Sequence, residues 1–189
     1  MLWGAHIGSL ELRTEGAETR LRATFPYGQE TVMVKGQAIE RREVFAPRAF
    51  SGWLDSGEDV HFLSGHDFNK PLASRAAGTL TLTDTESALV IDATISADLT
   101  EVSYVRDFLG SYRAGLVRGL SPGFRVSPGG ERVERRGDAI VRTVTEAELR
   151  EISAVVLPQY PQAQIEARSW AYMPAVRRAN FALHVNRWR

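Results

Sequence analysis

The chain has 189 residues, of which 43% are hydrophobic and 24% charged, and these fractions are typical of a single globular domain. It has no cysteine, which excludes disulfides, thiolate metal sites and cysteine nucleophiles. Its 23 basic residues balance its 23 acidic residues, so no net field steers the chain toward nucleic acid or membrane, and we expect neither as a partner.

The first half of the chain shows several strand patterns. The first twenty residues alternate weakly, which indicates a ragged leading strand, and they lack the features of a signal peptide, so we expect a cytoplasmic protein. The segment TVMVKGQAI at 31–39 predicts a strand broken at Gly36. Pro47 opens a short helical pattern. Three further strands are predicted at 59–65, 77–83 and 88–95, and the last two should form a hairpin.

The second half begins with the strongest helical pattern. Thr100 is expected to cap this helix and Gly115 to end it, and between them runs an apolar stripe consisting of Val102, Val105, Phe108, Leu109 and Tyr112. Residues 116–126 are expected to be extended, with an irregular middle.

Gly129 and Gly130 should turn the chain into two charged strands, and residues 148–157 predict an apolar strand that stops at Pro158. The tail from Pro161 should be helical in pieces. Many strands with a few inserted helices indicate a mixed α+β fold, with a barrel-like or sandwich core in place of alternating βαβ units.

A histidine and an aspartate follow the predicted strand that ends at residue 65. His66 in the segment GHDFN could act as a general base, because imidazole takes and returns a proton near neutral pH. A surface-loop histidine is the plainer interpretation. His61 lies nearby, but its spacing from His66 is not a familiar metal-ligand spacing, and we expect no metal and no cofactor.

A serine interrupts the apolar pattern at 116–126. Ser121 lies in GLSPG, which matches the G-x-S-x-G of the α/β-hydrolase nucleophile elbow. That fold is excluded because Pro122 has no N–H for an oxyanion, because only His184 follows the serine, and because strands do not alternate with helices. Ser121 remains a candidate nucleophile, and a β-bulge or turn that happens to carry a serine is the alternative.

A carboxylate lies within the last apolar strand. Alternation places Leu149, Glu151, Ser153 and Val155 on one face. Because a buried carboxylate costs several kcal/mol unless it is paired, Glu151 should have a partner. A histidine or one of the many arginines could serve.

Taken together, these segments resemble the HK97-like prohead protease family of tailed phages, which is distantly related in fold to the herpesvirus assemblins. The resemblance covers residues from about 20 to 168. It is carried by TVMVKGQAI, EVFAPRAFSGWL, GHDFNKPLASRAAGTLTL, GLVRGLSPGF and LREISAVVLPQYPQAQI, in that order. The sequence departs from the family pattern at the leucine and proline beside Ser121 and at Pro158-Gln159-Tyr160.

The resemblance implies a serine endopeptidase with an assemblin-like, mostly antiparallel, barrel-like fold. By this match Ser121 is the nucleophile and His66 the general base. Glu151 matches best the residue that orients the histidine, with Glu148 and Glu146 as alternatives. The implied domain spans residues 1–168, followed by a partly helical or flexible tail at 169–189.

The resemblance also implies the partners. The substrate would be the major capsid protein with its scaffold region, cut inside the assembling procapsid of a phage, a prophage or a gene transfer agent, with self-cleavage as a late step. Assemblin relatives are activated by dimerisation, so a homo-oligomer is possible. The alternative is a catalytically inactive assembly or scaffold protein with the same fold.

Overall fold

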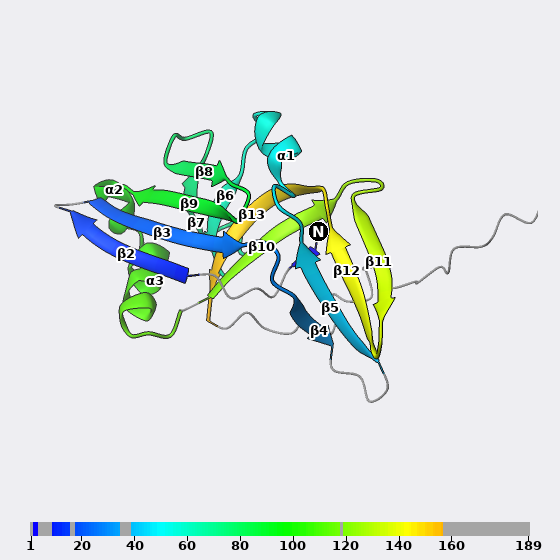
Figure 1. Ribbon diagram of the computed structural model, residues 1–189. Coiled ribbons are helices and arrows are strands. Elements are labelled where there is room, and N and C mark those ends of the chain that lie inside the picture. The colour runs from blue at the N-terminus through cyan, green and yellow to red at the C-terminus, as the bar shows by residue number, and fades with distance from the viewer. Residues whose placement is uncertain (1, 4–8, 16–17, 35–38, 118, 157–189) are drawn as a thin grey trace, which may run out of the picture.

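The computed structural model describes residues 2–3, 9–15, 18–34, 39–117 and 119–156 (Figure 1). Within these residues three short-to-medium helices accompany a set of strands. The helices are α1 (Ser51–Asp55), α2 (Ala97–Thr100) and α3 (Ser103–Arg113). The strands are β1 (Leu2–Trp3), β2 (Ser9–Glu15), β3 (Glu18–Pro26), β4 (Thr31–Val34), β5 (Glu40–Phe45), β6 (His61–Ser64), β7 (Pro71–Ser74), β8 (Leu80–Asp84), β9 (Ala88–Ile95), β10 (Gly119–Val126), β11 (Glu131–Arg136), β12 (Ala139–Val144) and β13 (Ala147–Val155).

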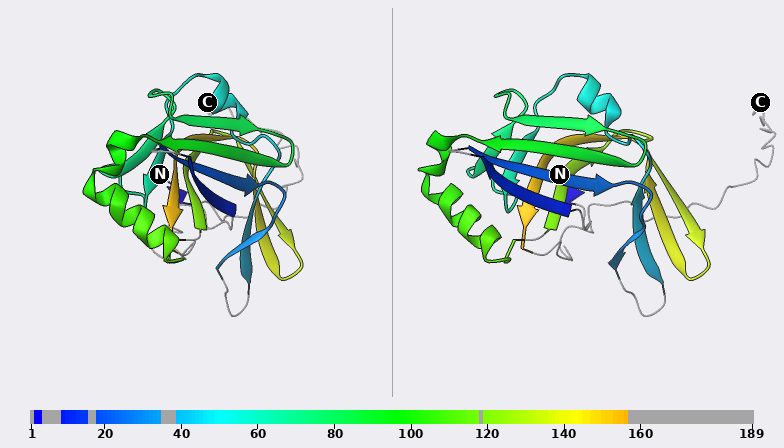
Figure 2. Two further views of the ribbon diagram at one scale, coloured as in Figure 1. Left: turned by 90° about the vertical axis from the view of Figure 1, so that its left-hand side faces the viewer. Right: turned by 60° about the vertical axis from the view of Figure 1, so that its left-hand side comes forward.

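The described strands form three sheets. Their strand orders are β1-β10-β13-β6-β7, β11-β12-β5-β4 and β2-β3-β9-β8. Most pairs are antiparallel, but β13 with β6 and β12 with β5 are parallel. The predicted mixed, mostly antiparallel fold is therefore confirmed, whereas the barrel is not: among the described strands no sheet closes on itself. The sheet of β4, β5, β11 and β12 projects at the end opposite α3 instead (Figure 2).

An aromatic cluster joins the three sheets. Phe25 of β3, Phe45 of β5 and Phe124 of β10 come one from each sheet, and all are at most 2% exposed. The ring centroids of Phe45 lie 5.2 Å from Phe25 and 5.0 Å from Phe124, and both pairs meet edge to face. Burying each phenyl ring contributes about 1.5–3 kcal/mol. The cluster fixes β10, which carries Ser121, against the rest of the molecule.

The helix predicted after Thr100 is present as α3, but it begins at Ser103. Val105, Phe108 and Leu109 are buried as the stripe requires, and Gly115, at φ 71°, follows the helix as expected. Thr100 is not the cap: it ends α2, where its hydroxyl donates to the carbonyl of Ala97. None of the described helices is long and apolar enough to cross a membrane.

Two predicted segments reach beyond the described residues. The strand at 31–39 is present as β4 over 31–34, and residues 35–38 lie outside the described part. The tail from residue 157 also lies outside it, so the boundary at 168 stays a prediction. The hairpin of β8 and β9 and the last strand, β13, are confirmed.

Candidate active site

Strand β13 lies at the centre of the five-stranded sheet. It pairs antiparallel with β10 on one side and parallel with β6 on the other. In this register Ser153 lies opposite Ser121 of β10, and Glu151 lies opposite Gly123. Residues directly opposite one another point to the same face of a sheet. The side chains of Ser121, Glu151 and Ser153 therefore share one face, and β13 connects them.

A β-bulge decides which face Glu151 occupies. Between Gly123 and Phe124 the pairing moves one residue along β10 but two along β13, from Glu151 to Leu149. Arg150 is thus the extra residue, and it reverses the alternation. Leu149 packs in the core, whereas Glu151 points to the opposite face with Ser153. The prediction that Leu149 and Glu151 share a face is wrong, because strict alternation ignores the bulge.

A closed ring of hydrogen bonds links Glu151, His66 and Ser153. Glu151 Oε1 lies 2.9 Å from His66 Nδ1, and Ser153 Oγ donates to Glu151 Oε2 at 2.6 Å. The backbone N–H of His66 in turn donates to Ser153 Oγ at 2.9 Å. Glu151 and Ser153 are fully buried. Both carboxylate oxygens therefore have a partner, which offsets the cost of burying the charge.

The loop after β6 holds the imidazole in place. Gly65 and His66 both adopt the left-handed conformation, with φ 67° and 63°. A non-glycine residue in that region costs about 1–2 kcal/mol and is kept only where neighbouring contacts require it. Here the N–H of Gly65 donates to the carbonyl of Ala154, and the N–H of His66 donates to Ser153. Strand β13 therefore fixes both residues of the turn.

Ser121 lies in the middle of a strand. The G-x-S-x-G pattern belongs to β10, not to a strand-to-helix turn, so the exclusion of the hydrolase elbow is confirmed. Gly123 has a different use here: a Cβ at this position would lie 2.1 Å from Glu151 Oε1. Because Gly123 has no side chain, the Glu151 carboxylate can occupy this space. Ser121 is 5% exposed, and 23% of the His66 side chain is exposed.

The other candidate residues lie elsewhere. Glu148 pairs with Arg150, and Glu146 is exposed ahead of β13, so of the three glutamates Glu151 is the one that contacts His66. His61 Nε2 lies 3.5 Å from Asp59 Oδ2. In the part of the chain that the structure describes, no three His, Asp or Glu side chains are grouped as metal ligands.

Ser153 is the residue to which the sequence alone assigned no role. Its one signal is the polar pair Glu151-x-Ser153 inside an apolar strand. Because it accepts from the His66 backbone and donates to Glu151, it positions both groups. The site as a whole therefore contains a hydroxyl, an imidazole and a buried carboxylate on one face, which are the groups that acyl transfer by a serine nucleophile needs.

A family model described as caudovirus prohead serine protease matches residues 10–175. The chain belongs to this family. No curated protein and no solved structure matched the chain. Membership confirms the resemblance to prohead proteases and makes the chain a member of a family of serine proteases, that is, of hydrolases. The likeness to assemblins and the roles of His66, Ser121 and Glu151 stay predictions.

Proposed function

We propose that this prohead-protease family member is a serine endopeptidase in which Ser121 is the nucleophile, His66 the general base and Glu151 the residue that orients His66. One observation carries the proposal. The His66 imidazole is bonded to a fully buried carboxylate on the sheet face that Ser121 shares. The family match supports the reaction class independently of this geometry.

The carboxylate sets the tautomer of the imidazole. An ionised Glu151 accepts a hydrogen bond but cannot donate one, so the proton of neutral His66 belongs on Nδ1. The lone pair of the ring then lies on Nε2, which is the atom that takes the Ser121 proton. When that proton arrives, the buried carboxylate stabilises the imidazolium. In comparable triads, loss of the correctly placed carboxylate costs about 10⁴-fold in rate.

The covalent steps follow from this arrangement. Ser121 Oγ forms a bond to the carbon of a peptide carbonyl while its proton moves to His66 Nε2. The C–N bond then breaks, and His66 returns the proton to the leaving amine, which leaves an acyl ester on Ser121. A water molecule next gives a proton to His66 and attacks the ester carbon. The C–O bond to Ser121 then breaks, and His66 returns the proton to Ser121 Oγ, which releases the acid and restores the serine.

The substrate follows from the family. A prohead serine protease acts during capsid maturation, so the protein substrate is a capsid protein. We place the cut in the scaffold-like N-terminal region of the major capsid protein, inside the assembling procapsid, with self-cleavage as a late step. A homo-oligomer is compatible with this role. The tail after Arg168, which is a reasonable place for a self-cleavage cut, lies outside the described residues.

Labelling with a fluorophosphonate tests the nucleophile. The probe should modify Ser121, as mapped by mass spectrometry, and Ser121→Ala should abolish both labelling and cleavage of co-expressed capsid protein. The half-buried Ser51 of α1 supplies a matched control, since Ser51→Ala should change neither. An unlabelled Ser121 together with an uncut capsid protein would favour the inactive assembly factor.

A second variant tests the carboxylate. Glu151→Gln keeps the size of the side chain but loses the charge that stabilises the imidazolium. We expect labelling to slow by orders of magnitude, though by less than after loss of the serine. Labelling at the unaltered rate would show that Glu151 is structural.

A further inference from the structure

A mostly apolar groove lies beside the site, on the far side of β6. Its volume is about 400 Å³, and its walls include His61, Phe68, Leu72, Leu99 and Tyr104. These residues come from β6, the loop after His66, β7, and the helices α2 and α3. Pockets of roughly 300–1,000 Å³ lined by apolar and aromatic side chains are typical of ligand sites.

The wall of the groove formed by His61 lies on the same sheet face as the site. His61 lies opposite Glu151 in the register of β6 with β13, so their side chains point the same way. Phe68 follows His66 by two residues in the same loop, and its ring centroid lies 6.1 Å from that of His61. The groove therefore has one wall on the strand next to β13, and its Phe68 belongs to the loop that carries His66.

The chemistry of the walls selects the ligand. Across the described lining there is no carboxylate, ammonium or guanidinium group, and the polar members are hydroxyls and the His61 ring. The Tyr104 hydroxyl already donates to the carbonyl of Pro71 at 2.8 Å, so Tyr104 offers its ring to the groove. Phe68 is 50% exposed. A half-exposed phenyl ring at a groove of this kind gains stability when an apolar group covers it.

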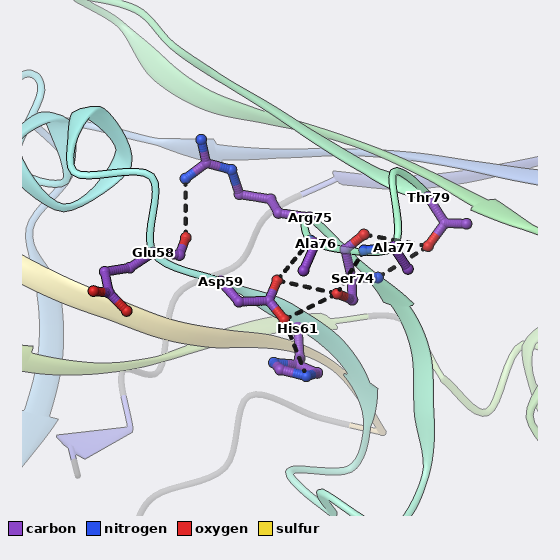
Figure 3. A network of polar contacts seen from close by, with 8 residues as sticks. All are labelled: Glu58, Asp59, His61, Ser74, Arg75, Ala76, Ala77 and Thr79. Carbon is purple, nitrogen blue, oxygen red and sulfur yellow. Dashed lines mark hydrogen bonds and ion pairs between the residues drawn. The ribbon is translucent and has the colours of Figure 1, made fainter.

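A polar network holds the His61 wall (Figure 3). The Asp59 carboxylate accepts from the Ser74 hydroxyl at 3.0 Å and from the Ala76 N–H at 2.9 Å, and it lies 3.5 Å from His61 Nε2. Desolvation raises the pKa of Asp59, but the Ala76 and Ser74 hydrogen bonds and the His61 charge outweigh it and lower that pKa below its ordinary value. Asp59 therefore stays ionised and keeps His61 at the edge of the groove.

The spacing of strands sets the distance to the nucleophile. Neighbouring strands lie about 4.8 Å apart, so β6 and β7 lie roughly 10 Å and 14 Å from β10. An extended peptide advances about 3.3 Å per residue. A chain crossing the sheet from Ser121 would thus bring its third or fourth residue over the groove.

We infer that this groove is a specificity subsite for the substrate polypeptide, taking an apolar side chain three or four residues from the scissile bond. The inference rests on the proposed protease function. The preference for an apolar substrate side chain is set by Phe68, His61 and Tyr104. A substrate whose side chain fills the groove should have a kcat/KM about 10-fold or more above that of a substrate with a much smaller side chain at the same position.

A peptide library tests the subsite. The protein is incubated with tryptic peptides of a denatured bacterial lysate, and the cut sites are mapped by mass spectrometry. We expect Leu, Met, Phe and similar residues to be enriched about 10-fold at one position three or four residues from the cut. Phe68→Ala, which removes a wall, and Ala77→Trp, which fills the groove, should each reduce that enrichment severalfold. Ile39→Ala alters an exposed apolar residue outside the groove and should leave the enrichment unchanged.

Fluorophosphonate labelling of Ser121 separates the possible failures, because the small probe does not extend into the groove. Loss of enrichment with labelling retained supports the subsite. Cleavage without enrichment at that position, or enrichment that survives both groove variants, overturns it and leaves the protease function standing. Loss of labelling in step with the enrichment would make Phe68 a support for His66 and also overturn the subsite. If the unaltered protein neither cleaves peptides nor becomes labelled, the proposed function and the subsite are overturned together.

Discussion

Replacing Gly123 with alanine adds one methyl group against the Glu151 carboxylate. The new Cβ would lie 2.1 Å from Oε1, whereas ordinary van der Waals contact begins near 3.4 Å. The carboxylate must therefore retreat by about 1.3 Å, the difference between these distances. Its bond to His66 Nδ1 is now 2.9 Å, so such a shift takes it beyond the usual 3.2 Å limit of an N–H···O bond.

The expected effect on reactivity is large. If the retreat breaks the His66–Glu151 hydrogen bond, the reactivity of Ser121 should fall toward the loss seen when the carboxylate of a triad is removed, which is about 10⁴-fold. Overpacking of this kind also lowers the free energy of unfolding by about 1–3 kcal/mol. Gly110→Ala is the matched control, because nothing lies within 4 Å of its Cβ in α3, and this change should stabilise the helix by about 0.5–1 kcal/mol.

The assay is the second-order rate of fluorophosphonate labelling, with urea unfolding to measure stability. A double variant isolates the clash: once Glu151→Ala has removed the carboxylate, adding Gly123→Ala should cost little stability and slow labelling no further. The reasoning would be refuted if Gly123→Ala alone labelled at the unaltered rate, or if its effect on stability persisted in full without Glu151.

Three further predictions concern stability and pH. Ser153→Ala should lower the free energy of unfolding by about 1–3 kcal/mol and slow labelling, because the His66 N–H and a Glu151 oxygen lose their partner. Glu43→Gln should cost on the order of 3 kcal/mol in urea unfolding, since it takes the charge from a buried ion pair with Arg142. Burial raises the pKa of Asp84 despite the hydrogen bond from Tyr27, so its contribution to stability is greatest at low pH and falls as pH rises from about 4 through the raised pKa. Asp84→Asn should remove that fall, and unfolding of both proteins across a pH series measures it.

Elements with a strong local period could be predicted from the sequence. The run ALVIDATI forms β9 over the predicted residues, and the apolar stripe of α3 is buried as expected. In both cases one face of a single element packs on the core, so the spacing of apolar residues within about ten positions contains the information.

Elements that depend on distant partners could not be predicted. Strand β5 has the sequence ERREVF, and its four consecutive charged residues do not show the alternation of apolar and polar residues that predicts a strand. Glu43 is nevertheless fully buried, because its carboxylate meets Arg142 of β12, ninety-nine residues away. The bulge at Arg150 is likewise set by the register with β10. The sequence of β13 alone does not indicate the bulge, and for that reason the prediction that Glu151 and Leu149 share a face was wrong.

The candidate site divides in the same way. Motif order brought His66, Ser121 and Glu151 together as a hypothesis, while Glu148 and Glu146 could not be set aside without the register. The use of Gly123 could not be foreseen either, because it depends on which residue of the paired strand lies opposite. Its actual neighbour is a carboxylate on another strand, nearly thirty residues away.

Strand β13 lies at the centre of its sheet but is synthesised after all the strands that it joins. The strand that separates β10 from β6 is the last described strand to leave the ribosome, although His66 precedes it by more than eighty residues. A nascent chain that has already produced His66 and Ser121 still lacks Glu151 and the strand that pairs with both β10 and β6. Under the proposed mechanism such a chain should be inert until β13 has been made and has taken its place between them.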